Sequence, residues 1–184
     1  MRRKAIHLAI VSYPAQLDAT LEEIAQTLAR GVDGTRVLER AQAHSDLRFL
    51  VRQWHLRQRE VVTLDLIGHG AAGRLSLGDD LLFASDGTGL ELADELAPFL
   101  SPRARVRLLG CGVGNAHSGG FDGGTLLRSL ERRLGAQRRV FAPTRPLSTR
   151  DYLPSGLTPA ALRALTGSTT HRRKHGRSKA VGNP

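Results

Sequence analysis

Short apolar runs alternate along this chain with segments in which apolar residues recur every three or four positions. Four runs have the length of buried strands: residues 5–11, 61–67, 106–109 and 140–142. Each is followed by glycine, proline or polar residues, where a buried strand gives way to a loop. Residues 35–39 could form a further short strand. Residues 74–77 alternate polar and apolar side chains, as a hairpin arm does.

The segments between these runs have the periodicity of helices. Helical spacing covers residues from about 20 to 31, 45 to 54, 89 to 100 and 125 to 134. Thr20 and Glu23 have the spacing of a capping box, and Ser45 is placed to cap the second helix. Gly31 and Gly135 stand where helices end. The alternation predicts an α/β fold with a mostly parallel central sheet and helices on both faces.

Two residues with nucleophilic or acid–base chemistry stand just past the ends of predicted strands. His69 lies within Gly68-His69-Gly70, and Cys111 lies within Gly110-Cys111-Gly112. Because the carboxyl ends of parallel strands meet at one edge of a sheet, we expect both side chains at the same rim. A thiol attacks as its thiolate, and a nearby imidazole can take its proton. The backbone N–H groups of Gly70 and Cys111 are placed to form an oxyanion hole.

The same residues allow other interpretations. A lone cysteine after an apolar strand is most often a small buried hydrophobic residue, and its flanking glycines can simply make a tight turn. Residues 68–73 fit G-x-G-x-x-G, but a dinucleotide site needs a helix to begin at the glycines, and residues 74–77 alternate like a strand. Metal binding by Cys111 with His69 or His117 lacks a familiar ligand spacing. His117 itself is interpreted as a solvated loop residue.

Three blocks of the sequence resemble the caspase-like cysteine peptidase superfamily. Residues 66–70 (Leu-Ile-Gly-His-Gly) and 73–78 are similar to its histidine-glycine block, and residues 108–112 (Leu-Leu-Gly-Cys-Gly) to its cysteine block. Residues 134–136, 140–143 and 145–151 are similar in rhythm to the block that follows the nucleophile. The closest resemblance is to the bacterial CHAT-type peptidases related to separase. It covers roughly residues 61–151, and the first sixty only by the order of elements.

The resemblance implies a three-layer caspase-like fold and a thiol protease, a hydrolase that cleaves protein or peptide substrates with a His69/Cys111 dyad and no metal or organic cofactor. The family places an acid or a glutamine two residues before the nucleophile, in the primary specificity pocket, and here that position is Leu109. The pocket would then draw on other residues. The candidates are Asp122, Asp151, Asp79 and Asp80. The alternative is a catalytically inactive caspase-like module used for protein interaction.

Length and charge divide the chain into two parts. Its 184 residues, 40% of them hydrophobic, suit one domain, which we place at residues 1–167. The formal net charge is +10. Half of that charge lies in residues 168–184, where five cations and no acid predict a basic disordered tail. Loose, salt-sensitive contact with nucleic acid through this tail is expected, and a basic nucleic-acid-binding protein is a third possible function. No aromatic residue is interleaved with the tail's cations for base stacking.

Cysteine count and hydropathy bear on the compartment. Cys111 is the single cysteine, so no internal disulfide can form, which fits a reducing, cytoplasmic setting. The basic start followed by the run at 5–11 imitates a signal peptide, but the apolar run is short and contains His7, so it is interpreted as a strand. No run is long enough to span a membrane, and a soluble protein is expected. The oligomeric state is left open.

Overall fold

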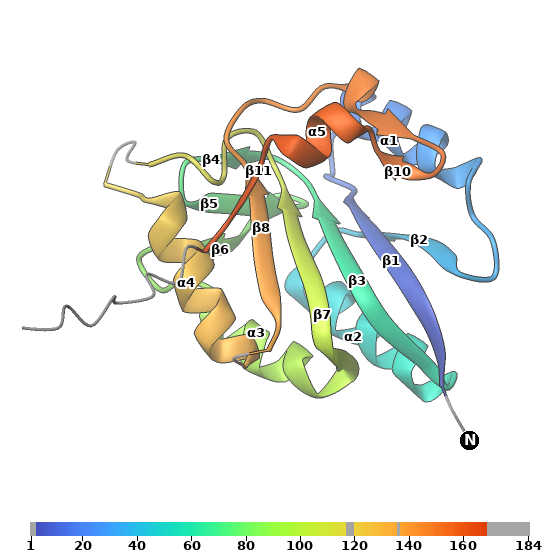
Figure 1. Ribbon diagram of the computed structural model, residues 1–184. Coiled ribbons are helices and arrows are strands. Elements are labelled where there is room, and N and C mark those ends of the chain that lie inside the picture. Colours follow the sequence, from blue (N-terminus) through green and yellow to red (C-terminus); the bar gives the residue numbers. More distant parts are fainter. Residues whose placement is uncertain (1–2, 117–119, 136, 169–184) are drawn as a thin grey trace, which may run out of the picture.

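A six-stranded sheet forms the centre of the protein. The computed structural model describes residues 3–116, 120–135 and 137–168. The strands lie in the order β11-β8-β7-β3-β1-β2, and only β11 runs antiparallel to its neighbour. Their bounds are Lys4–Ser12 (β1), Arg36–Ala41 (β2), Arg59–Ile67 (β3), Leu100–Leu109 (β7), Arg139–Pro143 (β8) and Leu165–Gly167 (β11). The fold is therefore α/β with a mixed, mostly parallel sheet (Figure 1).

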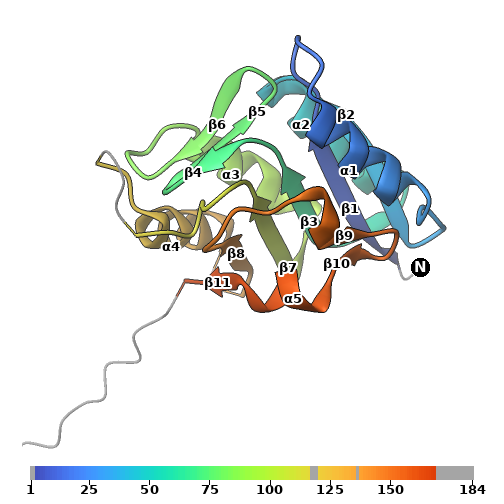
Figure 2. The same cartoon turned by 90° about the horizontal axis from the view of Figure 1, so that it is seen from above.

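Helices cover both faces of this sheet. One face carries α2 (His44–Leu56), α3 (Leu90–Leu96) and α4 (Gly123–Leu134), and the other carries α1 (Ala19–Ala29) and α5 (Pro159–Arg163). Figure 2, seen from above, shows α3 and α5 on opposite sides of the sheet. Successive side chains of a strand point to opposite faces. In β1, Leu8 and Ile10 accordingly belong to the larger core, and Ala9 and Val11 to the smaller one.

Small antiparallel units flank the sheet. A three-stranded unit follows β3 directly and consists of β4 (Gly70–Ala71), β5 (Arg74–Leu77) and β6 (Asp80–Ala84). Its residues Leu75 and Leu77 are fully buried in the larger core, which fixes the unit against the sheet. Near the C-terminus, 3-10 helix η2 (Thr149–Asp151) leads into the hairpin of β9 (Tyr152–Leu153) and β10 (Gly156–Leu157), which packs over the smaller core.

The apolar patterns located the strands well and the ends of helices less well. All four expected strands form, and so do those expected at 35–39 and 74–77. The cap at Thr20 is wrong, because α1 begins at Ala19 and the Asp18 carboxylate accepts from the Leu21 N–H at 3.0 Å. The cap at Ser45 is also wrong. Helix α2 begins at His44, and Asp46 accepts from two backbone N–H groups ahead of it.

Two stretches depart further from expectation. The helix expected to reach residue 100 ends at Leu96, and a 3-10 turn, η1 (Ala97–Phe99), contains Pro98, which cannot donate a helical hydrogen bond. Strand β7 then begins at Leu100, six residues before the apolar run that predicted it. Gly135 ends α4, as expected. Beyond Ser168, the expected basic tail lies outside the described residues.

None of the helices within the described ranges is long and apolar enough to cross a membrane.

Candidate active site

His69 and Cys111 follow neighbouring strands at equivalent positions. Strands β3 and β7 are parallel partners, and Ile67 is paired with Leu109 in their ladder. Both strands end at that pair. His69 and Cys111 each lie two residues farther along, so their loops leave the same edge of the sheet side by side. The structure therefore confirms that the two residues singled out by the sequence follow neighbouring strands at one edge of the sheet.

Two glycines let these loops touch. A Cβ atom added to Gly70 would lie 2.8 Å from the Cα of Gly110, and one added to Gly110 would lie 2.8 Å from the Cα of Gly70. Contacts that short leave no room for any side chain at either position. Direct backbone contact is thus built into the loops that carry His69 and Cys111.

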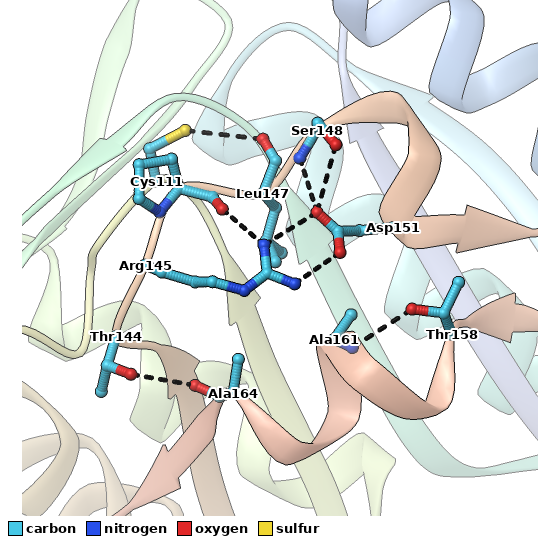
Figure 3. A network of polar contacts seen from close by, with 10 residues as sticks. Cys111, Thr144, Arg145, Leu147, Ser148, Asp151, Thr158, Ala161 and Ala164 are labelled. Carbon is cyan, nitrogen blue, oxygen red and sulfur yellow. Dashed lines mark hydrogen bonds and ion pairs between the residues drawn. The ribbon is translucent and has the colours of Figure 1, made fainter.

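The thiol of Cys111 faces outward rather than into the core. Cys111 is exposed, and its Sγ lies 3.9 Å from the carbonyl oxygen of Leu147, which follows β8 (Figure 3). The turn that presents it depends on Gly112, whose φ of 63° is unfavourable for other residues. The Gly112 N–H donates to the Arg145 carbonyl at 3.4 Å. The thiol therefore stands between the turn after β7 and the loop after β8.

The imidazole of His69 is held by a carboxylate that sequence reasoning missed. His69 Nε2 lies 2.7 Å from Asp18 Oδ2, and the other oxygen of Asp18 accepts from the Leu21 N–H as the cap of α1. The Leu21 N–H and, after it, His69 hold the pKa of Asp18 below its ordinary value, against the opposing effect of burial. With Nε2 engaged, Nδ1 is the ring nitrogen left for a proton transfer.

One local signal in the sequence points to Asp18. It stands directly before a segment with helical periodicity, and aspartate is among the preferred N-cap residues. The capping-box spacing of Thr20 and Glu23 instead favours a cap two residues farther along the chain. Nothing in the sequence, however, indicates that this cap would lie beside a loop fifty residues away.

The backbone geometry leaves the two expected oxyanion donors available. The Ser76 N–H donates to the His69 carbonyl at 2.8 Å, and Gly70 is paired with Leu75 in the β4–β5 ladder. Together these facts make Gly70 and Leu75 a non-hydrogen-bonded pair, so the Gly70 N–H points away from β5. Within the described ranges, no hydrogen bond engages the Cys111 N–H.

A cavity of about 420 Å³ opens beside Cys111. It is lined by small or uncharged side chains from three loops: Gly70, Ala71, Ala72, Cys111, Gly112, Asn115, Ala116 and Pro146. Both expected oxyanion donors, Gly70 and Cys111, belong to this lining. An extended peptide could therefore bring a carbonyl group to the thiol without crossing a bulky side chain.

The residues proposed for a specificity pocket lie elsewhere. Leu109 is 2% exposed and packs in the smaller core. Asp122 caps α4, where its carboxylate accepts from the Thr125 N–H at 2.7 Å. Asp79 accepts from the Ala15 N–H at 3.2 Å, and Asp80 is exposed at the start of β6. None of these four is among the residues lining the cavity beside Cys111.

Asp151 has a structural partner. Its carboxylate receives both outer nitrogens of the Arg145 guanidinium, at 2.5 and 3.0 Å, and the Ser148 N–H at 2.9 Å (Figure 3). The hydrogen bond from Arg145, together with those from Ser148, lowers the pKa of Asp151 to about 2, although burial acts in the opposite direction. This pair fixes the loop whose Leu147 carbonyl lies beside the Cys111 thiol.

The dinucleotide interpretation of residues 68–73 does not fit the fold. The glycines are followed by β4 and β5, so no helix N-terminus is present there to receive a pyrophosphate. The described residues contain no group of three or more histidine, cysteine or acidic side chains suited to hold a metal ion. His117 lies outside the described residues.

Comparison with known proteins identifies a family for this chain. A family model described as "Domain of unknown function (DUF4347)" matches residues 15–147, a range that includes Asp18, His69 and Cys111. No curated protein and no solved structure matches this chain.

Proposed function

Since the chain belongs to the DUF4347 family, a family of unknown function, we propose its activity from its own site: it is a caspase-like cysteine endopeptidase. Cys111 is the nucleophile, His69 is the general base and acid, and Asp18 holds His69. The substrate is a protein or peptide in an extended conformation. The three-layer α/β arrangement is compatible with a caspase-like fold.

One observation carries this proposal most directly. His69 and Cys111 each lie two residues beyond the paired residues Ile67 and Leu109, on loops whose glycines are in backbone contact. An exposed thiol, an imidazole held by a carboxylate, and available N–H groups at Gly70 and Cys111 supply the parts that acyl transfer needs.

The proposed reaction has two stages. The Cys111 S–H proton passes to His69, and the thiolate attacks the scissile carbonyl carbon. The N–H groups of Gly70 and Cys111 then hold the resulting oxyanion. As the C–N bond breaks, His69 returns its proton to the leaving amine, and a thioester remains on Cys111. Water then attacks this thioester while His69 takes its proton, and the C–S bond breaks to release the acid and restore the thiol.

Asp18 acts in this scheme as a positioning residue. Its carboxylate keeps Nε2 of His69 in place, leaves Nδ1 to exchange the proton, and stabilises the imidazolium when it forms. The His69 side chain is 62% exposed, so solvent screens this interaction. Hydrogen bonds to charged groups contribute a range of free energies, and we expect this one to lie at the lower end of that range. Its loss should lower the cleavage rate about tenfold.

A peptide-cleavage assay tests the proposal. The full chain is incubated with a library of extended peptides, and new termini are detected by mass spectrometry. His69→Ala should lower cleavage by about 10²- to 10⁴-fold, because that is the usual contribution of general acid–base catalysis. Cys111→Ala should abolish it. Asp18→Asn should lower it about tenfold.

The chain offers a matched control for Asp18. Asp122 caps α4 as Asp18 caps α1, and asparagine is an equally good cap. Asp122→Asn should therefore leave the cleavage rate unchanged. It controls for any effect on cleavage that comes only from replacing an N-cap aspartate.

A thiol probe alone is not sufficient evidence. Cys111 is the single cysteine, so Cys111→Ala loses labelling whether or not the site is catalytic. The informative comparison is the rate of alkylation at neutral pH, which should fall in His69→Ala if the imidazole promotes the thiolate. Equal rates together with no cleavage of any peptide would instead indicate a non-catalytic interaction module.

A further inference from the structure

Among the residues that the structure describes, no helix packs on one part of the central sheet. The face that carries α1 and α5 is covered along β1 and β2 and near the carboxyl ends of β3, β7 and β8. Figure 1 shows the lower halves of β3, β7 and β8, which are their N-terminal halves, with none of the described helices in front of them. We call this area the open face and define it by Thr63, Arg103, Arg105, Arg139 and Phe141.

The register of the strands gathers arginines on the open face. Thr63 is paired with Arg105, and Arg105 is paired with Arg139. Ala104, Val106 and Val140 belong to the larger core behind the sheet. By strand alternation, Arg103, Arg105 and Arg139 therefore point to the open face, where all three are exposed.

These arginines are poorly neutralised. Arg139 lies 3.7 Å from Glu131, a long contact, and within the described ranges no ion pair joins Arg103 or Arg105 to an acid. Asp65 lies two residues beyond Thr63 on the same face of β3, but it is buried and already hydrogen-bonded to Arg107 and His7. Arg105 of β7 and Arg139 of β8 are paired on adjacent strands. Like charges in that position destabilise a sheet. An anionic partner would relieve this repulsion.

An aromatic ring stands beside the arginines. Phe141 follows Arg139 by two residues on the same face of β8, is paired with Arg107, and is partly exposed. A row of arginines next to an aromatic ring on an open sheet is suited to single-stranded nucleic acid, whose phosphates take the cations and whose bases stack on the ring.

We propose that the open face binds single-stranded nucleic acid. Charge complementarity favours this occupant over the alternatives. The chain's own C-terminal tail carries five cations and no acid, so it would be repelled. A second copy docked face to face would bring arginines against arginines. This inference is independent of the proposed peptidase activity.

Fluorescence anisotropy with labelled single-stranded oligonucleotides, in DNA and RNA form, tests the proposal. The full chain is used with its five tail cations changed to glutamine, so that binding by the tail is removed: Arg172→Gln, Arg173→Gln, Lys174→Gln, Arg177→Gln and Lys179→Gln. Affinity should fall steeply between 50 and 200 mM salt. The slope of log affinity against log salt is negative. Adding Arg103→Gln, Arg105→Gln and Arg139→Gln should make it less steep by about 2, which corresponds to about 0.7 for each lost phosphate contact.

Two variants separate the open face from net charge alone. Arg52→Gln, Arg128→Gln and Arg132→Gln remove the same charge from α2 and α4 on the other side of the sheet, and should have a much smaller effect. Phe141→Leu keeps an apolar side chain but removes the ring, and should weaken binding by several-fold to about a hundredfold.

Three results would overturn the proposal. The first is no oligonucleotide binding at 50 mM salt. The second is an equal loss in the two arginine triple variants, which would indicate net charge rather than a site. The third is failure of oligonucleotides to compete with an acidic peptide that does bind. Thermal unfolding of the open-face variant should match or exceed that of its parent, which shows that a loss of binding is not a loss of folding.

Discussion

The most consequential buried charge in the protein is Asp65, in the middle of β3. It is 3% exposed, and its two oxygens receive Arg107 Nε and Nη2, both at 2.5 Å, and His7 Nε2 at 2.8 Å. Burial alone would raise the pKa of Asp65. Hydrogen bonding to His7 and the charge of Arg107 more than offset that effect and hold it below the ordinary value.

Removing this charge should destabilise the fold strongly. Asp65→Asn leaves the Arg107 guanidinium, whose side chain is 11% exposed, beside a neutral group. Removing one partner of a buried ion pair costs about 3–5 kcal/mol. Urea denaturation should show a loss of that size in the free energy of unfolding. A loss below about 1 kcal/mol would mean that Arg107 reaches solvent when its partner is removed.

At the scale of elements, the loop from β8 to β9 is the one that approaches the thiol. It has no regular structure before η2, and the ion pair between Arg145 and Asp151 is the main interaction within it. This ion pair holds the loop so that the Leu147 carbonyl lies beside Cys111 and the Arg145 carbonyl accepts a hydrogen bond from the Gly112 N–H. The loop should loosen when Asp151 loses its charge.

This leads to a defined pH dependence. The pKa of Asp151 is lowered from 3.8 to about 2, so its contribution to stability is complete above about pH 4 and is lost as pH falls toward 2. The difference in unfolding free energy between the wild-type chain and Asp151→Asn should be constant from pH 7 to 5 and shrink between pH 4 and 2. Denaturation curves at each pH measure it. A difference that does not change with pH would exclude the ion pair as its source.

The sequence predicted elements better than the contacts between them. The strands and the loop positions of His69 and Cys111 follow from local signals, namely apolar runs that stop at glycine. The role of Asp18 does not, because it depends on where α1 is placed relative to a loop after β3. The early start of β7 does not follow from the sequence pattern, because Arg103 and Arg105 interrupt it. Polar residues are tolerated there because none of the described helices covers that part of the sheet.

On the scale of the whole molecule, the two cores differ in size and in what they support. The larger core holds α2, α3 and α4 and contains the largest share of the buried side chains. The smaller core holds α1, which carries Asp18, and the β9–β10 hairpin. Local opening takes place where fewer apolar contacts must be broken. The layer that positions His69 should therefore open before the sheet unfolds.

A matched pair of leucine variants tests this expectation. Leu130 of α4 is 1% exposed in the larger core, and Leu21 of α1 is 5% exposed in the smaller one. Leu130→Ala should lower the global unfolding free energy by about 2–5 kcal/mol and leave the alkylation rate of Cys111 at 25 °C unchanged. Leu21→Ala should cost less global stability but speed hydrogen exchange in α1, and it should shift the reactivity of Cys111 toward that of His69→Ala, because α1 then no longer holds Asp18 against the imidazole. Hydrogen exchange read by mass spectrometry, together with the alkylation rate, measures both effects. Equal protection of α1 in the two variants would mean that the molecule opens as one unit, and that Asp18 stays beside His69 for as long as the fold persists.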